Sequence, residues 1–283
     1  MATCPHPIPY QGSKRRLAAQ VLAFVPNDVD TLWEPCCGSA AVSLAAAREQ
    51  RARRFVLGDS LAPLCSLWQR ILDEPGALAD EYQRLWSAQR EAPRAWYDEV
   101  REAFNADHDP AKLLFLLARC VKSAVRFNAA GAFNQSPDRR RRGTRPERMR
   151  EHLLGASALL AGRTEVRAGD YAHALDEATA GDLVYLDPPW QGTSGARDRR
   201  YHQQHERERF VADLERLLAR GVRVVVSYDG RTGDRRYGEP LPERLGLVRR
   251  ELFAGRSTQA TLHGRSSETV ESLYLSPSLV GAG

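Results

Sequence analysis

The residues with the most specific chemical potential in this chain are Asp187, Pro188, Pro189 and Trp190, which are consecutive in the sequence. They follow the apolar run 183–186, which is typical of a buried strand in an open α/β sheet, and ligands of such sheets bind beyond the carboxyl ends of the strands. The prolines remove two backbone donors, so the turn presents acceptors and a flat indole face. An exocyclic amine on an aromatic base needs that combination. The alternative interpretation is a strand-ending turn followed by a core tryptophan.

A second group of small and acidic residues fits a nucleoside. The segment 34–40 (Glu-Pro-Cys-Cys-Gly-Ser-Ala) joins a predicted strand to a predicted helix, so a ligand can approach its backbone and meet free N–H groups. It is neither a G-x-G-x-x-G loop nor a phosphate loop, which disfavours dinucleotides and nucleoside triphosphates. Asp59 and Asp170 each end a later strand, placed to accept from ribose hydroxyls and from an adenine amine respectively. Taken alone, Gly38 would be interpreted as a helix-packing glycine and Asp59 as a turn residue. The small-residue loop and the strand-end carboxylates together, in this order, predict a pocket for a nucleoside without phosphate.

The elements that must position these groups follow a βαβ pattern at both ends of the chain. Short apolar runs alternate with longer helical patterns, which predicts an α/β fold built on an open sheet. The predicted strands are Thr31–Trp33, Arg54–Leu57, Glu165–Arg167, Leu183–Leu186 and Val222–Ser227, the predicted helices are Ala40–Glu49 and Glu206–Arg220, and Leu247–Phe253 with Thr269–Leu275 form a closing antiparallel hairpin.

The middle of the chain has a different pattern. From Leu61 to about Arg126 apolar residues recur at helical spacing, and the segment 127–150 is polar and contains the run Arg139–Arg142. We expect a helical insertion, residues 61–150, inside a catalytic domain made of residues 1–60 and 151–283. The arginine run contacts phosphates in one interpretation and is a solvated charge cluster in the other.

Composition narrows the classes of partner. Hydrophobic residues make up 42% of the 283 residues and charged residues 27%, as in a protein with a sizeable core, and no apolar run is long enough to cross a membrane. No signal-peptide pattern is present, and the five cysteines form no C-x-x-C pair, so we expect reduced thiols, no metal site and a cytoplasmic location. The net charge of +5 weakly favours an anionic partner such as nucleic acid, although the basic residues are almost all arginines, which a GC-rich genome also produces.

These blocks occur in the order of a known family. The chain resembles the Dam-like (D12 class) DNA adenine-N6 methyltransferases, over roughly residues 10 to 275. The resemblance rests on Tyr10–Lys14, Glu34–Ala40, Asp59, Arg126–Asn128, Gly131–Asn134, Gly169–Tyr171 and Asp187–Trp190.

The resemblance implies a Rossmann-like sheet that binds S-adenosylmethionine, an inserted helical target-recognition domain, and double-stranded DNA as the partner of a monomer. It implies cofactor contacts at Tyr10, Lys14, Glu34, Pro35, Cys36, Gly38, Ser39, Asp59, Asp170, Tyr171 and Asp187. It implies catalysis at Asp187, Pro188, Pro189 and Trp190. Contacts with nucleic acid are expected at Lys14, Arg126, Asn128, Asn134, Arg139, Arg140, Arg141 and Arg142.

Two residues depart from the family pattern, and several alternatives stay open. Ala40 replaces a common glycine, which narrows the loop, and Trp190 replaces the usual tyrosine or phenylalanine but keeps a stacking face. Rival functions are methylation of RNA adenine, whose enzymes lack the Tyr10–Lys14 block, and DNA binding by a protein whose methyltransferase site has decayed. The loop 191–201 could close over a base or be an ordinary surface loop, and Ser227–Gly230 could line the pocket or form a simple turn.

Overall fold

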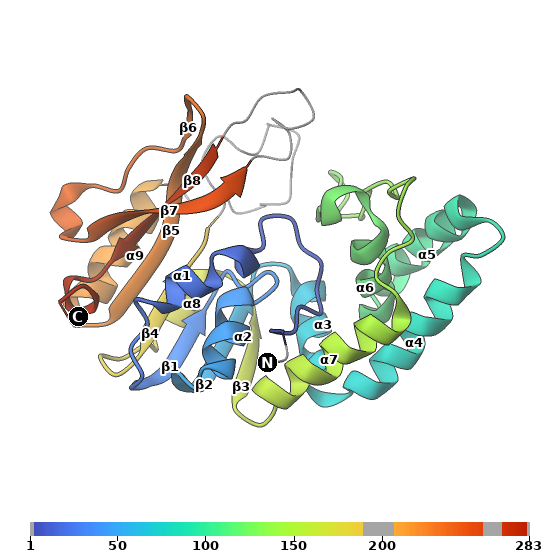
Figure 1. Cartoon of the computed structure of the whole chain (residues 1–283), viewed down its shortest axis with the longest axis horizontal. Coiled ribbons are helices and arrows are strands. Elements are labelled where there is room, and N and C mark those ends of the chain that lie inside the picture. The colour runs from blue at the N-terminus through green and yellow to red at the C-terminus, as the bar shows by residue number, and fades with distance from the viewer. Residues whose placement is uncertain (1–2, 189–206, 257–267, 282–283) are drawn as a thin grey trace.

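The computed structural model describes residues 3–188, 207–256 and 268–281. Within these residues the strands form one eight-stranded sheet in the order β3-β2-β1-β4-β5-β8-β7, with β6 paired to β5 (Figure 1). The strands are β1 Val29–Glu34, β2 Ala52–Asp59, β3 Thr164–Ala168, β4 Leu183–Leu186, β5 Arg223–Thr232, β6 Arg235–Tyr237, β7 Val248–Arg256 and β8 Glu268–Leu275.

The order of the strands reverses in the middle of the sheet. After β1 the chain adds β2 and then β3 on one side, and later places β4 and β5 on the other side, all in parallel. Such a reversal between neighbouring strands, here β1 and β4, is a topological switch point, where a crevice opens at the carboxyl ends. The predicted mixed α/β fold with a mostly parallel sheet is confirmed, and so is the closing antiparallel pair of β7 and β8.

Helices cover both faces of the sheet. They are α1 Ala18–Leu22, α2 Ala41–Arg48, α3 Ala62–Asp73, α4 Pro75–Ala88, α5 Pro93–Asp107, α6 Pro110–Arg119, α7 Pro146–Leu160, α8 Tyr171–Leu175 and α9 Arg207–Ala219, with 3₁₀ turns at Lys14–Arg16, Val121–Ser123, Glu243–Leu245 and Pro277–Leu279. Four of the helices begin with proline, whose fixed φ suits a first helical position.

Two apolar clusters fill the space between these layers. One cluster joins β1 and β2 side chains such as Leu32 and Phe55 to α2, α3 and the helices of the middle segment. The other cluster packs Val184 and Val224 against α8 and α9 on the opposite face. The central strand β4 is apolar on both faces because both of its faces are covered, as in other parallel sheets.

The middle segment is helical from residue 62 to residue 119, as expected, and then irregular to residue 145. Figure 1 shows α3 to α7 gathered beside the sheet. Helix α7 begins at Pro146 and packs against α4, α3 and α2, so it crosses the predicted boundary at residue 150. The division into a catalytic domain and an insertion therefore stays a prediction, with α7 contacting both parts.

Among the described residues, every helix is too short or too polar to cross a lipid bilayer.

Candidate active site

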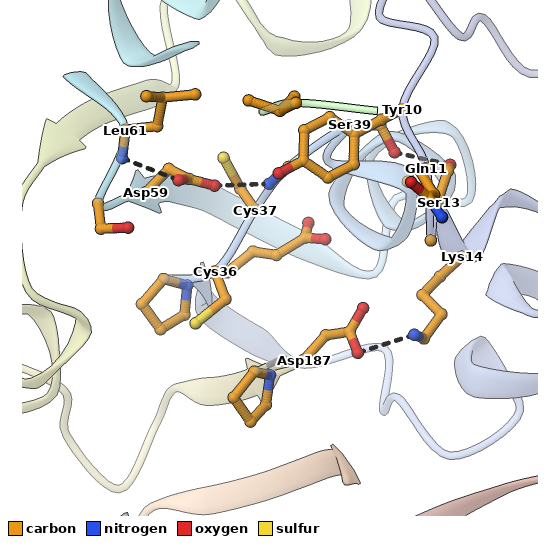
Figure 2. A pocket seen from close by; sticks show the side chains of 18 of the residues that line it. Tyr10, Gln11, Ser13, Lys14, Cys36, Cys37, Ser39, Asp59, Leu61 and Asp187 are labelled. Carbon is orange, nitrogen blue, oxygen red and sulfur yellow. Dashed lines mark hydrogen bonds and ion pairs between the residues drawn. The ribbon is translucent and has the colours of Figure 1, made fainter. Parts of the chain in front are cut away.

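A cavity of about 360 Å³ lies at the switch point, at the carboxyl ends of β1, β2 and β4 (Figure 2). This volume is in the range of small-molecule sites. The structure brings eleven of the predicted residues to its wall, namely Tyr10, Lys14, Glu34, Pro35, Cys36, Gly38, Ser39, Asp59, Tyr171, Asp187 and Pro188. Pro189, Trp190 and the loop 191–201 lie outside the described residues.

The side chains of Lys14 and Asp187 contact one another in the wall of the cavity, as Figure 2 shows. The Lys14 ammonium lies 2.8 Å from Asp187 Oδ1 and 3.2 Å from an oxygen of Glu271. Burial raises the pKa of Asp187 to about 6, although Lys14 opposes this effect. Burial lowers the pKa of Lys14, but the two carboxylates outweigh burial and hold that pKa above its usual value. The site therefore keeps a charged lysine between two acidic groups.

Glu34 is buried at the end of β1, where its carboxylate accepts a hydrogen bond of 2.9 Å from the Ser43 backbone N–H in the first turn of α2. Burial raises the pKa of Glu34 to about 7, and the bond from Ser43 lowers it in part. Negative charge is favourable at a helix N-terminus, so this contact holds the glutamate in the wall of the cavity.

Three hydrogen bonds that involve Gly38 or Asp59 stabilise the loop between β1 and α2 and the neighbouring loop after β2. Asp59 accepts from Gly38 N at 3.1 Å and from Leu61 N at 3.0 Å (Figure 2). The indole of Trp68, which is buried in α3, donates to the Gly38 carbonyl at 2.9 Å. Gly38 has a φ of +48°, and an added Cβ would lie 3.0 Å from the Tyr10 ring. Both the conformation and the packed tyrosine therefore favour glycine here.

Ala40 stands where the family commonly has glycine. It adopts a left-handed φ of +46°, a conformation that disfavours residues with a Cβ. Ala40 is fully buried and does not line the cavity, whereas its neighbours Ser39 and Ala41 do. The expected narrowing of the loop therefore stays a prediction.

The N-terminal segment forms hydrogen bonds with the loop after β1 and with the middle segment of the chain. The Ser13 hydroxyl lies 2.7 Å from that of Ser39, and the Gln11 backbone N–H donates to the Ser123 carbonyl at 3.0 Å. These contacts place Tyr10 over Gly38 and aim Lys14 at Asp187.

Asp170 lies beside the cavity. Its carboxylate caps α8 by accepting from Ala172 N at 2.9 Å, and it forms an ion pair of 2.7 Å with Arg209. The neighbours Gly169 and Tyr171 line the cavity, but Asp170 does not. The contact between the Asp170 carboxylate and an adenine amine therefore stays a prediction.

Apart from Lys14, the predicted contacts with nucleic acid do not line the cavity. Arg126, Asn128 and Asn134 are exposed on the segment 126–134. The side chain of Asn128 accepts from Ala130 N and Ala132 N at 2.9 and 3.0 Å, so it shapes the turn of this segment.

The run Arg139–Arg142 is also exposed, and two of its backbone carbonyls accept hydrogen bonds from side chains of the helical segment. The Arg119 guanidinium donates to the Arg141 carbonyl, and Gln89 donates to the Arg142 carbonyl at 3.1 Å. Four exposed arginines are compatible with both interpretations, contact with phosphates and a solvated charge cluster, so the phosphate contact stays a prediction.

Some residues of the cavity wall were missed in the sequence, Glu271 and Thr269 of β8 among them. They line the cavity because β8 runs antiparallel to β5 and its first half lies at the carboxyl ends of the parallel strands. The sequence predicted β8 as part of a closing hairpin, but no local signal shows that β5 lies on its other side.

The segment Ser227–Gly230 belongs to β5, so its interpretation as a simple turn is wrong. It is not among the residues that line the cavity, but the Ser227 hydroxyl donates to Glu271, which does, at 3.2 Å.

The sheet, its switch point and an acidic cavity define an α/β protein of Rossmann-like architecture with a small-molecule site. The model of the D12 class N6 adenine-specific DNA methyltransferase family matches residues 10–250, and the chain belongs to this family.

Several characterised proteins are similar in sequence. The chain is 28% identical over 258 residues to a DNA N-6-adenine-methyltransferase of Escherichia phage P1, covering 88% of this chain and 32% of that protein. It is 24% identical over 196 residues to modification methylase StsI of Streptococcus sanguinis, covering 67% and 29% respectively. It is 24% identical over 212 residues to a DNA adenine methylase of Serratia marcescens, covering 74% of each. The chain thus spans about a third of the length of the first two relatives.

Proposed function

We propose that this chain transfers a methyl group from S-adenosylmethionine to N6 of an adenine in double-stranded DNA, at a specific sequence. The observation that carries the proposal is the position of Asp187, whose carboxylate lies in the same cavity as Glu34 and Asp59 at the switch point. An acceptor for the target amine and acceptors for a nucleoside cofactor thus share one space.

The charges of the cavity fit this cofactor. Of the described residues in its wall, four carry carboxyl groups and Lys14 carries the one amine; the acids are Glu34, Asp59, Asp187 and Glu271. This set would repel phosphates and attract a cation. When bound, S-adenosylmethionine supplies a cationic sulfonium that bears an electrophilic methyl group. In the proposal Asp59 accepts bonds from the ribose, and Glu34 attracts the amino group of the methionine moiety.

The N6 nitrogen of adenine is a poor nucleophile, because its lone pair is delocalised into the ring. In the proposal the Asp187 carboxylate and the Pro188 carbonyl accept the two amino hydrogens and draw the lone pair out of conjugation. Holding the amine in line with the methyl group supplies much of the acceleration. Asp187 need not be a strong base, since the proton leaves after methyl transfer.

The target base must leave the duplex before it can reach Asp187, at a cost of a few kcal/mol. We assign Trp190 as the stacking partner of the extruded adenine, an interaction worth roughly 1–3 kcal/mol. Arg126, Asn128, Asn134 and the run Arg139–Arg142 are proposed to contact the DNA around the site. A monomer that acts on cytoplasmic DNA is the corresponding biological unit.

Transfer of labelled methyl groups to matched substrates tests this function. The full chain is incubated with labelled S-adenosylmethionine and with duplex DNA, single-stranded DNA or RNA. The proposal expects label in duplex DNA and N6-methyladenine in its digest. Label mainly in RNA would favour an RNA methyltransferase, and DNA binding without label would favour a decayed enzyme.

A further inference from the structure

Glu271 has no role in the function proposed so far, yet it contacts the same lysine as Asp187. The Lys14 ammonium lies 3.2 Å from Glu271 and 2.8 Å from Asp187. We propose that Glu271 is a positioning residue, which holds the Lys14 ammonium and thereby frees the Asp187 carboxylate for the target amine. This inference rests on the proposed function.

The first step of the argument is a competition for Asp187. Its Oδ1 atom is occupied by an ammonium group, whose charge-assisted hydrogen bond is roughly twice as strong as one from a neutral donor. The amine of an adenine is a neutral donor, and it binds Asp187 more weakly while the ammonium neutralises the charge of that carboxylate. Release of Lys14 from Asp187 requires another anionic partner for the ammonium within reach.

Glu271 is such a partner and is held in place. Its side chain is only 15% exposed, and its oxygen accepts from the Ser227 hydroxyl at 3.2 Å. Its backbone lies in β8, opposite Gly230 of β5 and Leu252 of β7. Because an ammonium group has three donors, Lys14 can keep its bond to Glu271 while it releases Asp187.

The balance of charge leads to the same conclusion. One lysine between two carboxylates leaves a net negative charge, so neither carboxylate is fully neutralised. Without the charge of Glu271, Lys14 and Asp187 would form a closed neutral pair in a buried place, which is costly to break. Lys14 of the N-terminal segment lowers the pKa of Asp187 and Glu271 of β8 raises it. The charge of Asp187 in turn raises the pKa of Glu34 of β1, Tyr185 of β4 and Cys36 of the loop after β1.

The test is a cycle of two substitutions, Glu271→Gln and Lys14→Met, assayed by methyl transfer to duplex DNA. In the presence of Lys14, Glu271→Gln should lower kcat about tenfold or more, since a charge-assisted bond then holds Asp187. In the Lys14→Met background the same change should cost less than about twofold, because no ammonium remains to be held. Equal losses in both backgrounds would mean that Glu271 only supports the local structure, and would overturn the inference.

The pH profile of Glu271→Gln alone gives a second readout. Glu271 raises the pKa of Asp187, which lies at about 6, so removal of its charge should move the acid limb of kcat/KM to lower pH. A structural role would leave that limb in place, which would also overturn the inference.

Glu251→Gln is the matched control. Glu251 lies on the neighbouring strand β7, is 50% exposed, and approaches Arg231 only to 3.8 Å. The substitution removes the same charge outside the cavity and should leave kcat within about twofold, as is usual for exposed ion pairs. A folded wild-type chain that methylates no nucleic acid would refute the proposed function and this inference together. If the wild type is active and Glu271→Gln lowers kcat equally in both Lys14 backgrounds, the inference is refuted while the proposed function stands.

Discussion

Replacement of Asp59 by alanine should weaken cofactor binding about 10- to 150-fold. Each oxygen of Asp59 accepts one backbone N–H, from Leu61 at 3.0 Å and from Gly38 at 3.1 Å. A carboxylate has about four acceptor positions, so about two remain for ribose hydroxyls in the cavity. One hydrogen bond to a charged group contributes about 1.5–3 kcal/mol, which corresponds to the stated range in Kd.

The same substitution should also destabilise the free protein, by about 1–3 kcal/mol, because the N–H groups of Gly38 and Leu61 lose their acceptor. The two effects are separated by two measurements: calorimetric titration with the stable cofactor analogue sinefungin, and urea unfolding of the chain without ligand. Asp59→Asn keeps one acceptor oxygen and should lose less in both.

Asp170→Ala tests the other predicted cofactor carboxylate in the same way. Its carboxylate caps α8, pairs with Arg209 and does not line the cavity, so if it serves the helix alone sinefungin affinity should change by less than about threefold. An Asp59→Ala variant that is destabilised but binds sinefungin like the wild type would refute the ribose assignment, since the carboxylate would then serve the loop alone. A large loss at Asp170 would instead support its predicted contact with the cofactor adenine.

Three further outcomes are expected. Asp187→Ala should abolish labelled methyl transfer while sinefungin still binds, and measurable turnover would contradict the mechanism. Burial raises the pKa of Glu34 to about 7, and the ionised form attracts the cationic ligand, so sinefungin affinity should fall as the pH falls from about 8 to about 6. Glu34→Gln should remove that dependence, and a wild type without it would exclude the contact. Joint replacement of Arg139 and Arg140 by alanine should weaken binding to cognate and scrambled duplexes about equally and flatten the slope of log affinity against log salt by about 0.9 for each phosphate that the variant no longer neutralises. An unchanged slope would remove this segment from the interface, and a changed sequence preference would show that the arginines read bases.

The sequence by itself determined the local elements and the order of the motifs. The predicted strand Leu183–Leu186 coincides with β4. The predicted strand Arg54–Leu57 lies within the longer β2, and the predicted strand Val222–Ser227 begins one residue before the longer β5. These predictions succeed because a covered parallel strand needs a continuous apolar run, and the run is visible without knowledge of its neighbours. Strand ends were less accurate, since they depend on pairing with other strands.

Part of the site was also determined locally. Glu34, Gly38 and Asp59 all follow or end strands, and the carboxyl ends of parallel strands meet at one edge of a sheet. Given a parallel sheet, their convergence on one cavity follows from sequence position. Gly38 carries a positive φ, as a residue without Cβ at such a turn would suggest.

Only the tertiary structure decided which distant residues complete the site. Glu271 reaches Lys14 because β8 inserts antiparallel between β5 and β7. Trp68 reaches the Gly38 carbonyl because α3 packs over the loop. Asp170 pairs with Arg209 of α9, a residue that lies far from it in the sequence. Periodicity and propensity report how a residue relates to its near neighbours along the chain, whereas strand order and side-chain pairing depend on how all the apolar faces are covered at once, and that is a property of the whole fold.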